Sequence, residues 1–264
     1  MILTKKNIIS GLTKLNVQKG DRLICHVSLS SGGWVVGGSP SIVDALCNVV
    51  TKDGIIMFPT HTGHYSDPKF WENPPVPEEW YNIIYENMPP FRSDITPCRS
   101  TIGKVAETFR NYPNACRSSH PVRSVSAMGK GAESIVSIRT YDFPHGKNSP
   151  IHKMFQKNAK ILLLGVSNMK NTSLHLCEYL SELSQDIRMQ KAPILNNQGE
   201  RELITYKDIK YKVNAEIREQ IMQKYELEYP NLFSKTDIGR AEAKLYDMEH
   251  IVNFGTKFIN QNFA

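Results

Sequence analysis

Residues 22–60 read "RLICHVSLSSGGWVVGGSPSIVDALCNVVTKDGIIMFPT", and this stretch decides the class of fold. The apolar runs 22–29 and 54–60 predict two buried strands. Between them lies a glycine-rich loop, followed by a helix with Ser39 as a plausible N-cap and Pro40 at its first position. Strand, loop, helix and strand in this order are typical of an α/β sheet.

The same order of elements recurs along the chain. Helical spacing predicts an opening helix over 4–16, and further helices are expected within 100–113, 129–138 and 172–183. Residues 159–165, "AKILLLG", predict another central strand, and 192–210 predict a late β-hairpin around a glycine-containing turn. We therefore expect an α/β fold, with a mixed central sheet flanked by helices in α/β/α layers.

Size and composition indicate one globular domain over 1–264. The chain has 40% hydrophobic and 22% charged residues, which is ordinary for such a domain. We expect cytoplasmic localisation and no membrane association, because the N-terminus lacks a secretory pattern, no run is long enough to span a bilayer, and the five cysteines form no regular framework. The formal net charge is +6, but the lysines form no basic stripe, so no nucleic acid is expected.

Residues 61–98 break the pattern and predict a long, proline-rich lid loop. This segment has seven prolines and two tryptophans, and such a length of irregular chain is often a binding loop. Between 61 and 100 there are six acidic residues and three basic ones. Either the lid binds an amine-bearing substrate, or this imbalance is chance variation.

His175 lies just beyond the predicted strand 159–165 and near the start of the next helix. Asn171 or Thr172 is well placed to cap that helix, and a helix start lowers the pKa of an imidazole. A neutral imidazole can act as a general base, with Glu178 on the same helix face to orient a neighbour. The alternative is a buried histidine bonded to a carbonyl. Cys177 lies two residues from His175 and faces away from it, so a Cys–His pair is not expected.

Three other stretches carry weaker signals. The loop "RSSHPVRS" (117–124) offers donors for phosphate or carbonyl oxygens, although the sequence alone favours an ordinary surface turn. The loop "GGWVVGGS" (32–39) ends at a helix start, which favours an anion. His61 and His64 have no third ligand nearby, so no metal is expected.

With these residues assembled, the chain resembles the aminoglycoside 3-N-acetyltransferase family, which is distinct from the GNAT acetyltransferases. The matching stretches are "HVSLSSGGWVVGGSPSIVDAL" (26–46), "GIIMFPTHTGHYSDPKFWENPPVPEEW" (54–80), "STIGKVAETFRNYPNACRSSHPVRSVSAMG" (100–129), "GKNSPIHKM" (146–154) and "ILLLGVSNMKNTSLHLCEYL" (161–180). They cover most of 20–180, and beyond about 190 the resemblance is looser.

The resemblance implies transfer of an acetyl group from acetyl-CoA to an amine of an aminoglycoside or related amino sugar, by direct attack in a ternary complex. It implies His175 as the general base, with Asp208 after the hairpin as the partner carboxylate, in competition with Glu178. The acetyl-CoA side falls on two groups of residues: His26, Ser28, Gly33, Trp34 and Val35, and then Arg117, Ser118, His120 and Ser124. The substrate-facing segment falls on the lid, where we place His61, Tyr65, Asp67 and Trp80, together with His145 beyond it.

Two alternatives stay open. The same fold could acetylate a different small amine, because a protein of net charge +6 is not obviously attractive to a polycation. It could also be a non-catalytic protein that binds acyl-CoA. The partners expected are a small-molecule amine and coenzyme A, in a monomer or a homodimer.

Overall fold

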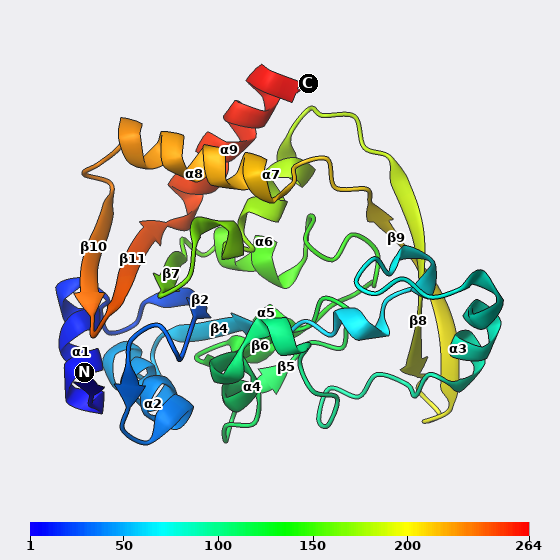
Figure 1. The fold of residues 1–264 in the computed structure, drawn as a ribbon, viewed down its shortest axis with the longest axis horizontal. Coiled ribbons are helices and arrows are strands. Elements are labelled where there is room, and N and C mark those ends of the chain that lie inside the picture. Colours follow the sequence, from blue (N-terminus) through cyan, green and yellow to red (C-terminus); the bar gives the residue numbers. More distant parts are fainter. Residues whose placement is uncertain (264) are drawn as a thin grey trace.

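A mixed sheet of seven strands forms the centre of the protein, whose residues 1–263 are described by a computed structural model (Figure 1). Its strands, in spatial order, are β10 (Phe233–Ile238), β11 (Ala241–Asp247), β7 (Lys160–Leu164), β2 (Arg22–Val27), β4 (Ile55–Pro59), β6 (Val125–Gly129) and β5 (Cys116–Arg117). The three central strands β7, β2 and β4 are parallel, and the outer ones pair antiparallel.

Helices cover both faces of the sheet, as the α/β/α expectation required. Because side chains alternate along a strand, Leu23 and Cys25 of β2 join one buried cluster while Ile24 joins the other. The first cluster includes side chains from α1 (Lys5–Lys14), α2 (Gly38–Val50) and α4 (Lys104–Arg110). The second includes side chains from α5 (Ala132–Val136), α6 (Pro150–Phe155), α7 (Leu174–Leu180), α8 (Ala215–Glu228) and α9 (Met248–Phe263).

The start of α2 differs from the expectation. Its N-cap is Gly37, which has a left-handed backbone with φ of 76°, and the helix begins at Gly38. The Ser39 hydroxyl lies 2.7 Å from that of Thr108 on α4 instead of capping the helix. The preceding glycine-rich loop includes a short strand, β3 (Trp34–Val35), which pairs in parallel with β1 (Ile2–Leu3).

The late hairpin begins earlier than expected and forms a separate two-stranded sheet. It consists of β8 (Ile187–Leu195) and β9 (Arg201–Ile209), so it starts five residues before the expected 192. The expected lid includes the 3-10 turns η1 (Gly63–Tyr65), η2 (Pro68–Phe70) and η3 (Glu78–Trp80), and the helix α3 (Tyr81–Asn87). Figure 1 shows α3 beside the hairpin, away from the central sheet. Phe91 continues the contact, because its N–H donates to Pro193 O at 2.9 Å.

The parallel centre of the sheet determines where a site can form. The carboxyl ends of parallel strands lie at one edge, where ligands bind in open α/β sheets. Ser28 follows β2 there, Thr60 follows β4, and Gly165 follows β7. From Gly165 the chain passes through the 3-10 turn η5 (Asn168–Lys170) into α7. Among the described residues, no helix combines the length and the apolar character needed to cross a bilayer.

Candidate active site

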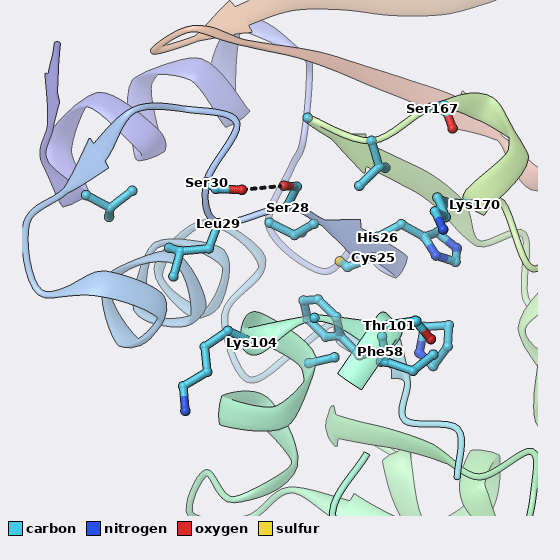
Figure 2. A pocket seen from close by; sticks show the side chains of 18 of the residues that line it. Cys25, His26, Ser28, Leu29, Ser30, Phe58, Thr101, Lys104, Ser167 and Lys170 are labelled. Atoms are coloured by element: carbon cyan, nitrogen blue, oxygen red, sulfur yellow. Dashed lines mark hydrogen bonds between the residues drawn. The ribbon is translucent and has the colours of Figure 1, made fainter. Parts of the chain in front are cut away.

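A cavity of about 840 Å³ opens at the carboxyl end of β2 (Figure 2). Its lining includes all five residues that the resemblance placed on the N-terminal part of the acetyl-CoA side: His26, Ser28, Gly33, Trp34 and Val35. The ends of β2 and β4, the turn around Gly103 after η4 (Ser100–Ile102) and the segment after β7 supply most of the rest. A loop, a helix start and two strand ends therefore meet around one cavity.

The charge of this cavity is positive. Its two charged side chains are Lys104 and Lys170, and no Asp or Glu is in its lining. Neither lysine forms an ion pair with any of residues 1–263. Figure 2 shows Lys170 beside His26 and Lys104 toward the other end of the view. Such a lining suits an extended ligand with several negative charges.

His26 connects this cavity to the helix that bears His175. Its ring is 9% exposed, and its Nε2 accepts a hydrogen bond from the Thr172 N–H at 3.4 Å. Burial lowers the pKa of His26 to about 3, so the ring is neutral. Thr172 also lines the cavity and lies three residues before His175. The end of β2 and the start of α7 are thus held together beside the cavity.

Three histidine rings form a row beyond His26. The centroids of His61 and His145 are 5.4 Å apart, and those of His145 and His175 are 4.8 Å apart with the rings nearly parallel at 12°. Burial lowers all three pKa values well below the usual 6.5, so each ring is neutral at neutral pH. His145 and His175 are stacked face to face, whereas His61 is tilted by 41° from His145. No group of three or more His, Cys, Asp and Glu side chains within 1–263 has an arrangement that could hold a metal ion.

His175 lies in the first turn of α7, as expected, but the cap differs. The N-cap residue is Ser173, which makes no side-chain capping bond, while Asn171 Oδ1 accepts from the Ser173 N–H at 3.0 Å. After burial, the charge of Arg218 is the next cause that lowers the pKa of His175. The Arg218 Nη1 lies 3.4 Å from both ring nitrogens of His175. Tyr211 meets the ring edge-on, with centroids 4.7 Å apart.

Asp208 reaches this row through tyrosines rather than by a direct bond to His175. Its Oδ1 accepts from the Tyr179 hydroxyl at 2.5 Å and from the Ile209 N–H at 2.8 Å, and lies 3.5 Å from the Tyr211 hydroxyl. That Tyr211 hydroxyl is 3.0 Å from His145 Nδ1. Burial raises the pKa of Asp208. The carboxylate therefore orients Tyr211, which in turn contacts His145.

Glu178 has a different setting from the one expected. Its Oε1 accepts from the Lys212 N–H at 2.5 Å, and its Oε2 accepts from the Val213 N–H at 3.3 Å. Both oxygens are therefore used to hold the segment that follows β9. No hydrogen bond joins Glu178 to His175 within the described chain.

The second group of expected acetyl-CoA residues does not line the cavity; these are Arg117, Ser118, His120 and Ser124. Their polar atoms form hydrogen bonds within the protein. Arg117 donates to Thr60 O at 2.6 Å and Thr96 O at 2.5 Å. The other three also make internal bonds: Ser118 Oγ accepts from the Val125 N–H, His120 Nδ1 accepts from the Val122 and Arg123 N–H groups, and Ser124 Oγ donates to Thr60 O. These residues brace the loop 117–124 against the end of β4.

Of the expected substrate-binding residues, His61 and His145 join the histidine row and three lie elsewhere. Asp67 is buried, and its oxygens accept from the Tyr85 hydroxyl at 2.6 Å and from the Lys69 and Lys191 N–H groups. Tyr65 packs edge-on against Phe91. Trp80 is 52% exposed at the start of α3. We find no contact of these three with the row in the part of the chain that is described.

Sequence reasoning missed four residues around the row: Arg123, Tyr179, Tyr211 and Arg218. Arg123 belongs to the loop 117–124, and its charge contributes, after burial, to lowering the pKa of His61, His145 and His175. Arg218 and Tyr211 come from segments far along the chain from His175, so no local pattern could have found them. Tyr179 lies on α7 four residues after His175, and this i, i+4 spacing is a local signal that could have found it.

Comparisons with known proteins agree on one family. The aminoglycoside 3-N-acetyltransferase family model matches residues 24–260. The "SPbeta prophage-derived aminoglycoside N(3')-acetyltransferase-like protein YokD" of Bacillus subtilis (strain 168) is 38% identical over 260 residues, covering 98% of this chain and 93% of that one. The "Aminoglycoside N(3)-acetyltransferase IX" of Micromonospora chalcea is 27% identical, covering 97% and 93%.

Solved structures show the same relationship. The crystal structure of YokD from Bacillus subtilis superposes with a TM-score of 0.94 at 36% identity, covering 99% of this chain and 95% of that one. The structure of AAC-VIa bound to sisomicin has a TM-score of 0.88 at 25% identity, with both chains fully covered. Because the match spans the central sheet, the cavity and α7 alike, the chain belongs to the aminoglycoside 3-N-acetyltransferase family.

Proposed function

We propose that this protein transfers the acetyl group of acetyl-CoA to an amine of an aminoglycoside or related amino sugar, with His175 as the general base. Membership of an acyltransferase family supports the reaction class. The observation that carries the residue assignment is the position of His175: it is a neutral imidazole in the first turn of α7, three residues after the cavity-lining Thr172.

The cavity supports acetyl-CoA as the donor. CoA is an extended molecule with several phosphates, and the cavity has two lysines with no carboxylate beside them. Lys104, which lies away from His26 in Figure 2, can contact the phosphates while the thioester lies near His26. The acetyl carbonyl then lies between the cavity and the histidine row.

Proton transfer explains why a neutral base is needed. The amine nitrogen attacks the thioester carbonyl carbon, and the N–C bond forms as the carbonyl electrons move to oxygen. His175 takes the proton that the nitrogen loses. Collapse of this adduct breaks the C–S bond, and the CoA sulfur leaves as thiolate and takes up a proton. A charged imidazole could not perform the first step, and burial keeps this ring neutral.

Direct attack fits the state of the cysteine thiols. Cys25 lines the cavity, but burial raises its pKa. Cys177 is fully buried, and burial raises its pKa to about 12. Because a thiolate is the nucleophilic form, neither supports a covalent acyl-enzyme. We therefore expect initial-rate plots with both substrates varied to intersect, as a ternary complex requires, rather than to run parallel.

Release of free CoA in the presence of acetyl-CoA and an aminoglycoside such as kanamycin tests the proposal. His175→Gln should lower kcat by roughly 10²–10⁴-fold, the usual contribution of a positioned base, while leaving the Kd for acetyl-CoA nearly unchanged. The matched control is His64→Gln, because His64 is an exposed histidine on η1. Full turnover by the His175 variant would rule out His175 as the base.

A further inference from the structure

An exposed tryptophan belongs to the lining of the cavity at the end of β2. Trp34 is 66% exposed, whereas the next residue in the same lining, Val35, is 7% exposed. This difference follows from the strand β3, in which successive side chains point to opposite sides. His26, also in the lining, is 9% exposed. The lining therefore has a buried part at His26 and an open part at Trp34.

The backbone that bears Trp34 is fixed by the strand β1. In the parallel pairing of β1 with β3, Ile2 lies opposite Trp34. The Trp34 N–H donates to Met1 O at 3.2 Å. Gly33 has a φ of 104°, and a Cβ at this position would lie 2.9 Å from Met1 O, so a glycine is needed for the loop to pass so close to β1. The indole is thus held at the cavity by a braced loop.

The side chains around the Trp34 ring leave it uncovered. Ile2 is 67% exposed and Val36, two residues beyond Trp34, is 42% exposed. Within residues 1–263 the indole N–H of Trp34 forms no hydrogen bond, whereas Trp71 Nε1 donates to Ser66 O at 3.1 Å. An exposed apolar patch beside a cavity with polar groups marks a place where a ligand binds. The ring face is therefore free for a planar ligand group.

The chemistry of the donor matches this division of the cavity. Coenzyme A has its thiol at one end and an adenine ring at the other, with phosphates between them. With the thioester near the buried His26, the adenine is the part that reaches the open side. Lys104, which is exposed and lies away from His26 in Figure 2, is available to the phosphates. Nucleic-acid bases stack on exposed aromatic side chains because both present π-faces.

From this arrangement we propose that the adenine ring of acetyl-CoA stacks on the indole of Trp34 at the open side of the cavity, with Ile2 and Val36 extending the apolar surface. The inference rests on acetyl-CoA as the donor in the proposed function and assigns the adenine end of that donor to a place in the structure. Stacking at this end contributes equally to the bound donor and to the transition state. It therefore changes KM for acetyl-CoA and leaves kcat unchanged.

Tryptophan fluorescence tests the contact directly and without an acceptor. The chain has three tryptophans, and stacking on adenine quenches an indole. We expect CoA to quench the fluorescence of the wild-type protein, and adenosine 3′,5′-bisphosphate, which lacks the pantetheine arm, to do the same. Trp34→Phe should remove most of this response. The matched control is Trp80→Phe, which should keep it, because Trp80 is exposed on η3 and does not line the cavity.

A second measurement separates the adenine from the rest of the donor. Trp34→Ala should raise the Kd for CoA, measured by calorimetry, by about 5- to 100-fold, the range for loss of one base–aromatic stack. It should leave the Kd for 4′-phosphopantetheine, which has no adenine, unchanged. Trp34→Tyr should restore most of the affinity for CoA, whereas Trp34→Leu should not, because leucine has no ring face.

The control for these binding measurements is Leu227→Ala. Leu227 is 82% exposed near the end of α8 and does not line the cavity, so this variant should bind both ligands as the wild type does. In the acetyl-transfer assay with kanamycin, Trp34→Ala should raise KM for acetyl-CoA by the same factor as the Kd, with kcat retained.

The outcomes separate this inference from the reaction itself. An equal loss of affinity for CoA and for 4′-phosphopantetheine in Trp34→Ala would overturn the inference, because Trp34 would then serve the loop or the pantetheine arm. Unchanged affinity for CoA in that variant would also overturn it. Turnover by a wild-type protein whose fluorescence does not respond to CoA would overturn the inference and leave the acetyl transfer standing. Quenching by CoA that depends on Trp34, with no turnover on any amine, would overturn only the acetyl transfer.

Discussion

Mild acid should destabilise this protein strongly, because several histidines are buried as neutral rings. His26, His61, His120 and His145 are all at most 9% exposed. Burial lowers the pKa of His26 and His120 to about 3, and lowers those of the other two well below 6.5. The unfolded chain protonates these rings near pH 6.5, whereas the folded chain does not. Stability is therefore lost as the pH falls from about 6.5 towards the folded values.

The magnitude follows from proton linkage. Between pH 7 and pH 5.5, a histidine with an unfolded pKa of about 6.5 that stays neutral when folded costs about 1.2 kcal/mol. Four such residues cost about 5 kcal/mol, a large part of the roughly 5–15 kcal/mol that stabilises a typical domain. Asp208 and Glu178 act in the opposite direction. Burial raises their pKa values, so as the pH falls the folded chain takes up these protons before the unfolded chain does, and this stabilises the fold. We expect a net loss of about 3–5 kcal/mol.

Urea unfolding at a series of pH values, followed by circular dichroism, measures this loss. His145→Gln should reduce the pH-dependent part by about 1.2 kcal/mol relative to its own stability at pH 7. Trp34→Ala removes a cavity residue that does not titrate, so its pH dependence should match that of the wild type. A total loss below about 1 kcal/mol over this range would refute the assignment of neutral buried rings.

Two further predictions concern neighbouring residues. Glu178→Gln should lower the free energy of unfolding by about 1–3 kcal/mol, because its carboxylate accepts two backbone N–H groups, while turnover persists. Loss of turnover in a protein of unchanged stability would instead restore a catalytic role. Lys104→Gln and Lys170→Gln should each raise KM for acetyl-CoA about 3- to 10-fold at low salt, and the effect should shrink near 0.5 M salt because exposed charges are screened. An unchanged KM in both variants would show that acetyl-CoA does not bind in this cavity.

The local hydrophobic pattern was enough to predict the parallel strands at the centre of the sheet. The apolar runs that predict β2, β4 and β7 are continuous because both faces of these strands are buried, as in parallel sheets generally. The C-terminal third of the chain was harder to predict from the sequence. Strand β11 adds to the sheet beside β7, and α8 and α9 cover one face, yet none of them was predicted. Pairing across some eighty residues of chain leaves no local signal.

The site shows the same division. His26, Ser28, Gly33, Trp34 and Val35 are close in sequence, and the structure brings them together on one cavity. The residues of loop 117–124 that were expected on the acetyl-CoA side do not line this cavity. The sequence could not show this, because an arginine, a histidine and two serines can either bind a ligand or stabilise a turn. Only the distances to carbonyl and N–H groups distinguish these uses.

By itself, the sequence determined the class of fold, the strand–loop–helix unit that builds the cavity, and the place of His175 at a helix start after a buried strand. These follow from hydrophobic periodicity and helix-end chemistry, which act over a few residues. The tertiary structure alone decided that His175 stacks on His145, that the carboxylate of Glu178 accepts backbone N–H groups, and that Arg218 lies against the ring of His175. Such contacts join segments that are far apart in the chain, and burial, which sets the charge of each ring, exists only once those segments have packed.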